Sequence, residues 1–383
     1  MKSNLKVAIT QDYIRYGGRF MVIATMIDAL NKLNITPDVL SFVSDIDSKG
    51  VEKKYHNKLK FTAIKVPFNW FKKMTEFRKI WFNLIIMSKY YKKYDIIINS
   101  NNSAIFLQSQ SVINYIHFPR FDRILKNEFF NTHKNIKLKT SFLVRVDYLL
   151  SRGLYNLFSL DKDQANIANS IFTKKRLSAV HAIPESKIDV LYPPVVTDEA
   201  QPYQASEKKG FIISIGRFSQ TKNQLLQLKI AKKIPQLQFK LIGFSKEGND
   251  YLKTCYQFIE EQQLDNVELL VNISYDELQR ELKQATFFLH TTFEEPFGIT
   301  PVQAIANNCI PIVPNSGGPI EIVTLSNLRY NTKEEAIQII LEMQNKEDHS
   351  LLLQELKNNL KRFSKDEFIS KFNKILQGEN FKK

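Results

Sequence analysis

The stretch LHTTFEEPFGITPVQAIANNCIPIVPNSGGPIEIV, Leu289 to Val323, decides the fold. An apolar run, TFFLHTT (286–292), ends inside it and is typical of a buried strand, and the loop EEPFG follows. Pro301 then stands where the first turn of a helix is expected, and proline is well tolerated there. A second apolar run, CIPIVP (309–314), comes next, so the stretch predicts strand, loop, helix and strand in succession.

The same alternation of short apolar runs with helical patterns extends over most of the chain. Residues 20–33, for example, place apolar side chains at helical spacing. The other runs that predict strands are KVAIT (6–10), DVLSFV (38–43), TAIKV (62–66), DIIINS (95–100), NYIHF (114–118), ANIANS (165–170), KIDVLYPP (187–194), FIISIGR (211–217), QFKLIGF (238–244) and VELLV (267–271). Strands that alternate with helices favour an α/β fold whose parallel sheets are covered on both faces.

A polar segment without periodicity, residues 195–210, divides this alternation into two series. We therefore predict two doubly wound α/β domains, residues 1–198 and residues 199–360, with a cleft between them. We expect residues 361–383 to form a C-terminal helix that packs back on the first domain. Ligands of such sheets bind beyond the carboxyl ends of the strands.

Composition is that of a soluble globular protein, since 43% hydrophobic and 24% charged residues are ordinary values. The two cysteines, Cys255 and Cys309, are far apart in sequence, which favours a reducing compartment. The first residues lack the apolar core of a signal peptide, and no apolar run has the roughly 20 residues of a membrane-spanning helix. We therefore expect neither a leader nor a spanning segment.

The positive charge is unevenly distributed along the chain. The net charge is +15, and residues 1–200 carry 31 Lys and Arg against 17 Asp and Glu. Residues 201–383 carry 23 and 22. A basic surface attracts phosphates on nucleic acid, on anionic lipid or on a pyrophosphate-bearing substrate. The alternative, charge that serves solubility alone, does not explain why one half of the chain holds almost all of the excess.

Two cations follow the first strand of the second domain, in SIGRFSQTKN (214–223). Gly216 ends the strand, and Arg217 and Lys222 lie within one loop. An arginine fork and a lysine point charge at the carboxyl end of a strand can together hold a diphosphate. The alternative is an ordinary basic loop in solvent, and the position beside the expected cleft favours the diphosphate.

The opening stretch supplies further polar groups to the same edge. Glu295 lies in the EEPFG loop, and Gln303 follows eight residues later, about two turns into the expected helix. A carboxylate and an amide so placed can accept and donate hydrogen bonds to sugar hydroxyls. The turn NSGGPIEI (315–322) can present backbone N–H groups to an anion. The alternative, solvated acids and glycines that merely end a strand, is hard to hold against these features together.

The first domain offers a glycine turn and a histidine. Gly17 and Gly18, in YGGR (16–19), open the first helix, where backbone N–H groups can approach a phosphate. A tight turn between strand and helix is an equally good interpretation. His117 ends a strand in NYIHFP, where an α/β enzyme can place a donor to a substrate hydroxyl or phosphate. A structural histidine is the alternative.

Metal-binding patterns are weak. DID (45–47) and DKD (161–163) match the two-carboxylate pattern that some sugar transferases use, but so short a match arises often by chance. The sequence has no Cys/His metal spacing and no Walker loop. We expect no metal and no other cofactor.

A set of motifs occurs in the order of a known family, and the resemblance covers nearly the whole chain. The set is YGGR, NYIHFP, NSIFTKKRL, VLYPPV, SIGRFSQTKN, LHTTFEEPFG and NSGGPIEI, and it resembles the retaining glycosyltransferases of family 4. The resemblance implies the GT-B fold of two facing Rossmann-like domains and a nucleotide-sugar donor. LHTTFEEPFGI and PNSGGP are most similar to members that transfer mannose from GDP-mannose to lipid-linked glycans. A UDP-sugar donor, with glucose or GlcNAc, is the alternative.

The resemblance also implies roles for individual residues of the second domain. Arg217 and Lys222 would bind the donor diphosphate and stabilise the leaving nucleotide. Glu295 is the first acid of the family's E-x7-E motif, which contacts the donor sugar. The residues expected to line the donor site around them are Gly216, Phe297, Gly298, Ile299 and Gln303. Gln303 departs from the family, where a second Glu usually holds the nucleotide ribose, so the charge-assisted bond is lost.

In the first domain, the resemblance places His117 near the reacting centre, as a hydrogen-bond partner of the donor sugar. Gly17 and Gly18 would approach the phosphates or the acceptor. Arg19 stands where many relatives carry Glu, which adds positive charge. Retention at the anomeric carbon is expected to proceed by same-face substitution, in which the leaving phosphate takes the acceptor proton.

The segment 69–94 is rich in aromatic and basic residues. Trp70, Phe77, Trp81, Leu84 and Ile85 fall on one helical face, as in a helix that lies in a lipid interface. A core-facing helix with a solvated basic side is the alternative. Together with the basic first half, the pattern favours a peripheral protein on the cytoplasmic face of a membrane.

Four other interpretations remain at this point. A different donor sugar stays within the family, and a GT-B epimerase fits the cation pair and EPFG less well. A nucleic-acid-binding module would need basic clusters on both domains and a known binding motif, and the sequence has neither. An inactive transferase-like scaffold would explain Gln303, but Arg217, Lys222 and Glu295 are intact.

Overall fold

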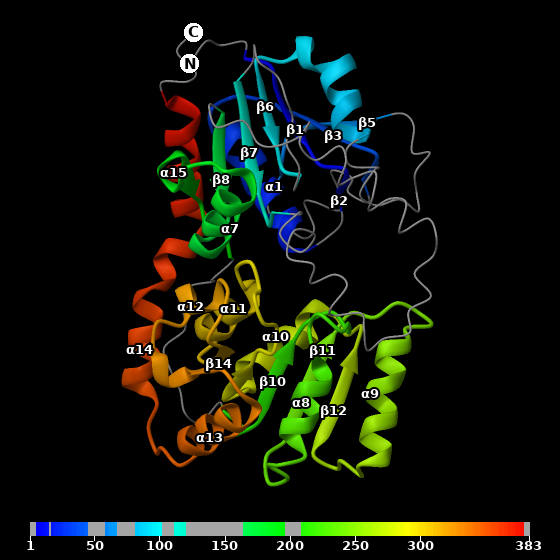
Figure 1. The fold of residues 1–383 in the computed structure, drawn as a ribbon, viewed down its shortest axis with the longest axis vertical. Helices are drawn as coiled ribbons and strands as arrows, with labels where there is room; N and C mark the ends of the chain where they lie inside the picture. The colour runs from blue at the N-terminus through cyan, green and yellow to red at the C-terminus, as the bar shows by residue number, and fades with distance from the viewer. Residues whose placement is uncertain are drawn as a thin grey trace. The chain divides into compact units, whose positions relative to one another are not determined.

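The computed structural model describes seven parts of the chain: residues 5–14, 17–44, 58–66, 81–101, 111–119, 164–195 and 208–378. The chain divides into two compact units (Figure 1). Unit 1 is Met1–Pro194 with Lys365–Lys383, and unit 2 is Val195–Ser364. The last helix of the chain therefore belongs to the same unit as the amino-terminal residues.

Unit 1 is built on a parallel sheet, in which seven strands are described. In the order in which they lie, these are β5 (Thr62–Lys65), β3 (Asp38–Ser41), β1 (Val7–Thr10), β6 (Ile96–Asn99), β7 (Ser111–Ile116), β8 (Ala165–Ala168) and β9 (Ile188–Val190). Every residue of β1 and β6 is buried. Continuous apolar runs such as VAIT and IIIN form these central strands because both faces of a parallel sheet are covered.

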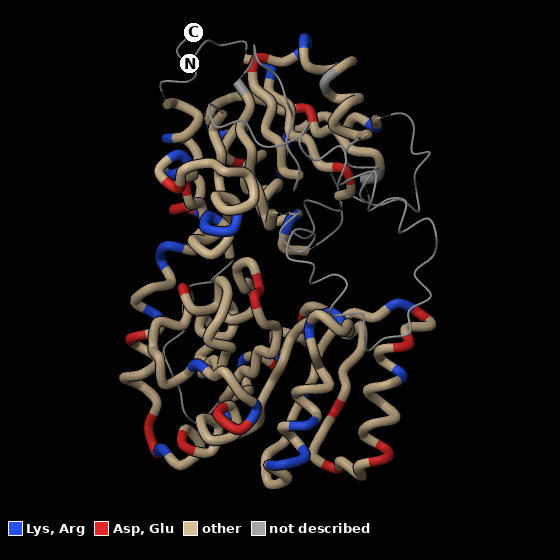
Figure 2. The backbone as a smooth tube through the Cα atoms, viewed as in Figure 1, with Lys and Arg blue, Asp and Glu red and all other residues tan. Residues whose placement is uncertain are grey.

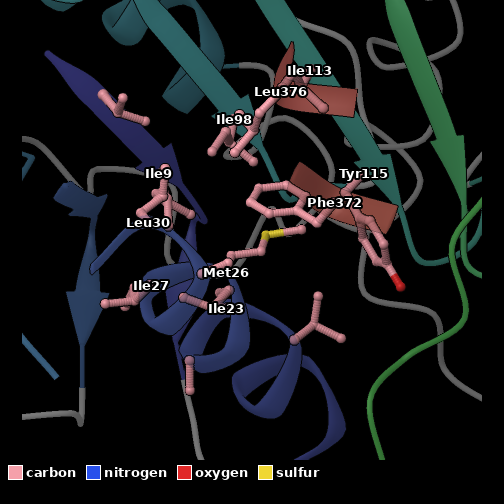
Figure 3. Close-up of a cluster of buried hydrophobic side chains, with 14 of the residues drawn as sticks. Ile9, Ile23, Met26, Ile27, Leu30, Ile98, Ile113, Tyr115, Phe372 and Leu376 are labelled. Carbon is pink, nitrogen blue, oxygen red and sulfur yellow. The ribbon is translucent and has the colours of Figure 1, made fainter. Parts of the chain in front are cut away.

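The helices α1 (Gly18–Lys32) and α15 (Lys365–Gln377) pack against each other and share one hydrophobic core with the sheet. Figure 3 shows Phe372 and Leu376 of α15 beside Met26 of α1 and Ile98 of β6. Phe372 and Met26 are fully buried. Because this core is assembled from both ends of the chain, α15 is part of the folded core of unit 1.

Apart from the segment that begins at Trp81, unit 1 has three further described elements. They are a two-stranded sheet of β2 (Tyr13–Ile14) and β4 (Val43–Ser44), helix α7 (Ile171–His181), and the 3-10 helix η4 (Glu185–Lys187). The N-cap of α7 is Ser170, whose side chain accepts a hydrogen bond from the backbone N–H of Thr173. This N-cap satisfies one of the unpaired donors at the start of the helix.

The basic aromatic segment is described only from Trp81 onward, so Trp70 and Phe77 lie outside the described residues. Residues 81–85 are helical and continue as a π-helix, η1 (Ile86–Tyr90), and a 3-10 helix, η2 (Tyr91–Lys93). Phe82, Ile85 and Ile86 are buried in a core cluster with the sheet, whereas Trp81 is 37% exposed. Trp81 and Ile85 are four residues apart on this helical stretch, and the burial of Ile85 against the sheet favours the core-facing alternative for the described part of the segment.

Unit 2 has a second parallel sheet. In spatial order, its described strands are β12 (Val267–Val271), β11 (Phe239–Gly243), β10 (Ile212–Ile215), β13 (Phe287–Leu289), β14 (Ile310–Pro314) and β15 (Arg329–Tyr330). Its described helices are α8 (Gln224–Ala231), α9 (Asp250–Glu261), α10 (Tyr275–Gln284), α11 (Ile299–Ala306), α12 (Pro319–Ile322), α13 (Lys333–Gln344) and α14 (Ser350–Asn358), with the 3-10 helices η6 (Ser326–Leu328) and η7 (Leu360–Phe363). Figure 2 shows that acidic and basic residues are intermingled along this unit.

The predicted fold class is confirmed: both units are doubly wound α/β structures with parallel sheets. Every run predicted to be a strand contains or overlaps one. The strands missed by the sequence analysis are β2, β4 and β15, each of two residues. Within the described residues, no helix is both long enough and apolar enough to cross a bilayer.

Candidate active site

Three loops of unit 2 follow neighbouring parallel strands and therefore meet at one edge of the sheet. The loop after β10 runs from Gly216 to Asn223, the loop after β13 from His290 to Gly298, and the loop after β14 from Asn315 to Gly318. These are the loops of the predicted cation, EEPFG and glycine motifs. The topology thus brings together three motifs that are separated by up to about a hundred residues in sequence.

Lys222 and Glu295 form the central contact of this edge. The Nζ atom of Lys222 lies 2.5 Å from Oε2 of Glu295, and their side chains are 28% and 20% exposed. Thr291 holds the backbone of Lys222 in place. Its hydroxyl donates to the backbone oxygen of Lys222 at 2.8 Å and accepts from the side-chain amide of Gln227 at 2.7 Å. The cation loop is therefore tied to the end of β13, and a partly buried charge-assisted bond joins the two motifs.

Arg217 extends from the same loop into solvent. Within the described part of the chain, no side-chain hydrogen bond or ion pair of its guanidinium is present. The loop backbone beneath it is fixed, because the side-chain amide of Gln224 donates to the oxygens of Gly216 and Arg217. A Cβ atom at Gly243 would lie 2.0 Å from the Gly216 oxygen. The glycine at position 243 therefore allows the end of β11 to approach the backbone of the cation loop closely. Arg217 is thus an exposed cation on a loop whose backbone is held by hydrogen bonds.

The EEPFG loop and the glycine turn pack backbone against backbone. The N–H of Gly318 donates to the oxygen of Glu295 at 2.7 Å, and the N–H of Glu294 donates to the hydroxyl of Ser316 at 3.1 Å. A Cβ atom at Gly317 would lie 2.6 Å from the Glu295 oxygen, and one at Gly318 would lie 2.4 Å from Cα of Phe297. The prediction that this turn presents its N–H groups to an anion is wrong for Gly318, whose N–H is engaged by the EEPFG loop.

The other residues predicted around the donor occupy the start of α11. Gly298 caps this helix with φ of 108°, a conformation that disfavours side chains, and Ile299 is its first residue. Phe297 is 3% exposed and packs edge-on against Phe363, with ring centroids 5.4 Å apart, so only its backbone can face a ligand. Gln303 is half-buried at the fifth residue of α11. It lies about one turn into the helix, not two, because the helix starts only at Ile299.

His290 belongs to this site, and the sequence analysis assigned it no role. It follows β13, is 4% exposed, and its Nε2 lies 4.0 Å from Oε2 of Glu295. Burial lowers the pKa of His290 to about 4, with an opposing effect of Glu295 and a further lowering by Lys222. The ring is therefore neutral at pH 7. The only available signal was a polar residue at the end of the buried run TFFLH.

In unit 1, His117 follows β7 and is buried. Its Nε2 lies 3.0 Å from the hydroxyl of Ser100, which follows the neighbouring β6, and its ring packs edge-on against Tyr115. Burial, and then the charge of Arg19, hold the pKa of His117 well below its ordinary value. A neutral histidine therefore stands at the carboxyl edge of this sheet.

Gly17 and Gly18 are exposed at the start of α1. Gly17 caps the helix with φ of 147°, which disfavours any side chain, although nothing lies within 4 Å of a Cβ built there. Arg19 follows in the first turn, which contains no acidic residue. An acid in this turn would repel an anion at the positive end of the helix, so the first turn of α1 is compatible with anion binding.

The two short carboxylate motifs, DID (45–47) and DKD (161–163), lie outside the described residues. Among the residues that are described, no three His, Cys, Asp or Glu side chains come together in a group that could hold a metal ion. Both cysteines are buried and unpaired: Cys255 lies on α9, and Cys309 directly precedes β14.

Comparison with known proteins defines the class. Residues 195–363 match the family model for glycosyl transferases group 1, which corresponds to unit 2. Unit 2 is thus similar to the glycosyl transferases of group 1, and the two parallel-sheet α/β units of the chain have the architecture of the GT-B fold.

Curated relatives are mannosyltransferases. The chain is 29% identical over 231 residues to the mouse GDP-Man:Man(3)GlcNAc(2)-PP-Dol alpha-1,2-mannosyltransferase, a match that covers 54% of this chain and 46% of the mouse protein. It is 25% identical over 353 residues to an alpha-1,3/1,6-mannosyltransferase of Rhizomucor pusillus, covering 72% and 73%. The chain thus spans about half the length of the mouse relative.

Among solved structures, Anabaena HepE in complex with UDP and glucose superposes with a TM-score of 0.70 at 15% identity, over 98% of this chain and 100% of that one. WaaG, a glycosyltransferase involved in lipopolysaccharide biosynthesis, superposes with a TM-score of 0.70 at 12% identity, over 97% and 100%. At such identities the likeness concerns the fold alone.

Proposed function

We propose that the chain is a retaining glycosyltransferase that moves α-mannose from GDP-mannose onto a lipid-linked glycan. The observation that carries the proposal is the contact between Lys222 and Glu295 at the carboxyl edge of unit 2, beside the exposed Arg217. It joins a diphosphate-binding cation to a carboxylate that can hold sugar hydroxyls. The activities for which the mannosyltransferase relatives are named support the choice of donor and acceptor.

In this proposal, the donor lies across the three loops of unit 2. Arg217 and Lys222 hold the diphosphate as fork and point charge. Glu295 accepts hydrogen bonds from the sugar, and the backbone from Phe297 to Ile299 lines the same region. Gln303 contacts the ribose through its neutral amide, where the family's carboxylate would make a stronger bond.

The chemistry is positioning and charge stabilisation. The acceptor hydroxyl attacks the anomeric carbon from the face that the diphosphate leaves, and a diphosphate oxygen takes the hydroxyl proton. Negative charge develops on the leaving diphosphate, where Arg217 and Lys222 stabilise it. His117, neutral at pH 7, serves as a hydrogen-bond partner of the donor sugar. The scheme uses no metal, because the two cations carry the charge of the leaving group.

The acceptor places the protein at a membrane. We assign this contact to the basic unit 1 and the location to the cytoplasmic face. The first 200 residues carry most of the net charge, and exposed Lys89, Lys92 and Lys93 surround the end of the segment that contains Trp81. Clusters of this kind gain about 1 kcal/mol per basic residue at an anionic surface.

The donor is tested by thermal unfolding with GDP, GDP-mannose, UDP, UDP-glucose and UDP-GlcNAc. A ligand that binds only the folded state at a hundred times its Kd stabilises it by about 2.7 kcal/mol. We expect GDP and GDP-mannose to raise the Tm, and Arg217→Ala to remove most of the rise. A rise with UDP-sugars alone contradicts the donor assignment but keeps the class, and no rise with any of them contradicts the proposed function.

The membrane contact is tested by flotation with vesicles that contain anionic lipid. We expect the protein to float at low salt and to be released at high salt, since screening weakens exposed charge contacts. Neutral vesicles are the control. Protein that stays at the bottom with anionic vesicles at low salt contradicts a peripheral location.

A further inference from the structure

One oxygen of Glu295 has two neighbours of different chemistry. Oε2 lies 2.5 Å from Nζ of Lys222 and 4.0 Å from Nε2 of His290. The first distance is a short charge-assisted hydrogen bond, and the second is just too long for any hydrogen bond. The carboxylate therefore bonds to the lysine, with the imidazole one small displacement away.

The His290 ring is held firmly where it is. Its backbone N–H donates to the oxygen of Ile312 at 2.9 Å, and its oxygen accepts from the hydroxyl of the fully buried Tyr330 at 2.6 Å. The ring stacks on Phe288, with centroids 6.3 Å apart and planes at 20°. The residue is fixed on both sides of its Cα and along one face of the ring.

Despite this fixation, Nε2 of His290 is buried without a hydrogen-bond partner among the described residues. A buried polar atom left unpaired costs about 1–3 kcal/mol and requires an explanation. A merely structural histidine would be expected to direct this nitrogen to a partner. Here it faces the carboxylate that the lysine already holds.

A bound diphosphate changes which neighbour Glu295 bonds to. Its charge competes for Lys222, so the bond between Lys222 and Glu295 weakens. The carboxylate is 20% exposed, and a charge at such a depth gains from a further hydrogen bond. A shift of about 1 Å brings Oε2 to the usual N–H···O distance from Nε2.

We propose that His290 is a positioning residue that receives Glu295 when Lys222 turns to the diphosphate. In the tautomer with a proton on Nε2, the ring donates to Oε2 and holds the carboxylate toward the sugar hydroxyls. Binding of the diphosphate thereby sets the carboxylate for the sugar. The inference rests on the proposed function, because it needs a sugar diphosphate in this site.

The test separates diphosphate binding from sugar binding. His290→Phe keeps a ring of similar size and removes Nε2, while His290→Gln keeps a side-chain N–H donor. His349→Phe is the matched control. His349 is also buried in unit 2, its Nδ1 has no hydrogen-bond partner among the residues that the structure describes, and its ring packs edge-on against Phe287, away from the three loops. Affinities for GDP and GDP-mannose are measured by titration calorimetry with each variant.

We expect His290→Phe to bind GDP within twofold of wild type, to bind GDP-mannose at least fivefold more weakly, and to lower kcat. His290→Gln recovers most of the loss, and His349→Phe binds both ligands as wild type does. His290→Phe that binds GDP-mannose as wild type, or that weakens GDP and GDP-mannose equally, overturns the positioning role.

The outcome is distinguishable from a failure of the proposed function. If wild type binds UDP and UDP-glucose in place of the GDP pair, the same comparison is made with that pair, and only the donor assignment fails. A wild-type protein that binds none of the four ligands overturns the proposed function and, with it, this inference.

Discussion

The close packing of the EEPFG loop on the glycine turn predicts that Gly318→Ala disables the site. Gly318 has φ of −65°, a backbone conformation that alanine also adopts. The substitution would by itself raise the free energy of unfolding by about 0.4–1 kcal/mol, because alanine restricts the unfolded chain more than glycine does. The new Cβ, however, would lie 2.4 Å from Cα of Phe297 and 2.6 Å from the oxygens of Pro296 and Phe297. Backbone atoms cannot rotate away as the end of a side chain can, so the two loops must separate.

The magnitude follows from what that separation breaks. Overpacking costs about 1–3 kcal/mol, and the loss of the Gly318-to-Glu295 hydrogen bond, 2.7 Å in length, costs about 1 kcal/mol. After the conformational gain, unit 2 loses about 2 kcal/mol of unfolding free energy, or about 4–8 °C in Tm. The displaced Glu295 lowers the affinity for the nucleotide sugar at least about tenfold, or roughly 1.4 kcal/mol.

The assay is thermal unfolding together with calorimetric titration of the donor. Gly248→Ala is the control, because Gly248 has φ of +71° but nothing within 4 Å of its Cβ position. That variant costs about 1 kcal/mol from backbone strain and leaves donor affinity unchanged. A Gly318→Ala protein that unfolds and binds as wild type refutes the argument that this glycine sets the position of Glu295.

Three further predictions concern buried groups. His290→Phe should remove part of the pH dependence of the free energy of unfolding. Because folding lowers the pKa of His290 from 6.5 to about 4, the neutral ring contributes stability that is lost as the pH falls from about 6.5 to about 4. Chemical denaturation at pH 7 and pH 5 should therefore show wild type losing about 2 kcal/mol more than the variant. Phe372→Ala, in the core that α15 shares with α1, should lower the free energy of unfolding by about 3–5 kcal/mol. Limited proteolysis should then cleave unit 1 faster than in wild type and leave the cleavage of unit 2 unchanged. Lys208→Met removes an ammonium that donates to the oxygens of Lys283, Ala285 and Asn307, at the C-terminal ends of α10 and α11, and should cost unit 2 about 2–3 kcal/mol in denaturant titration.

The strands were predictable because their apolar runs are long enough to carry a signal. VAIT and IIIN are buried on both faces, and such runs in a parallel sheet need no alternation. The two-residue strands β2, β4 and β15 were missed, since so short a segment has no period to detect. Their formation depends on neighbours that only the folded chain supplies.

The site was predictable as a set of motifs but not as a geometry. The position of each loop after a parallel strand places Arg217, Lys222 and Glu295 at one edge. The bond between Lys222 and Glu295 joins residues 73 positions apart, and no local pattern encodes it. The role of Gly318 was misjudged, because a glycine turn can present its N–H groups to a ligand or allow another backbone to approach. His290 was missed because its importance lies in burial and in one distance.

The central claim is tested most directly by transfer of labelled mannose from GDP-mannose to a dolichyl-diphosphate-linked glycan, with the anomer of the product determined by NMR. The neighbouring carboxylates give a matched pair of variants. We predict an α-linked product, a rate lowered about a hundredfold by Glu295→Gln, and a rate within about threefold of wild type for Glu294→Gln. A β-linked product, no transfer to the lipid-linked acceptor, or equal effects of the two substitutions would contradict the account.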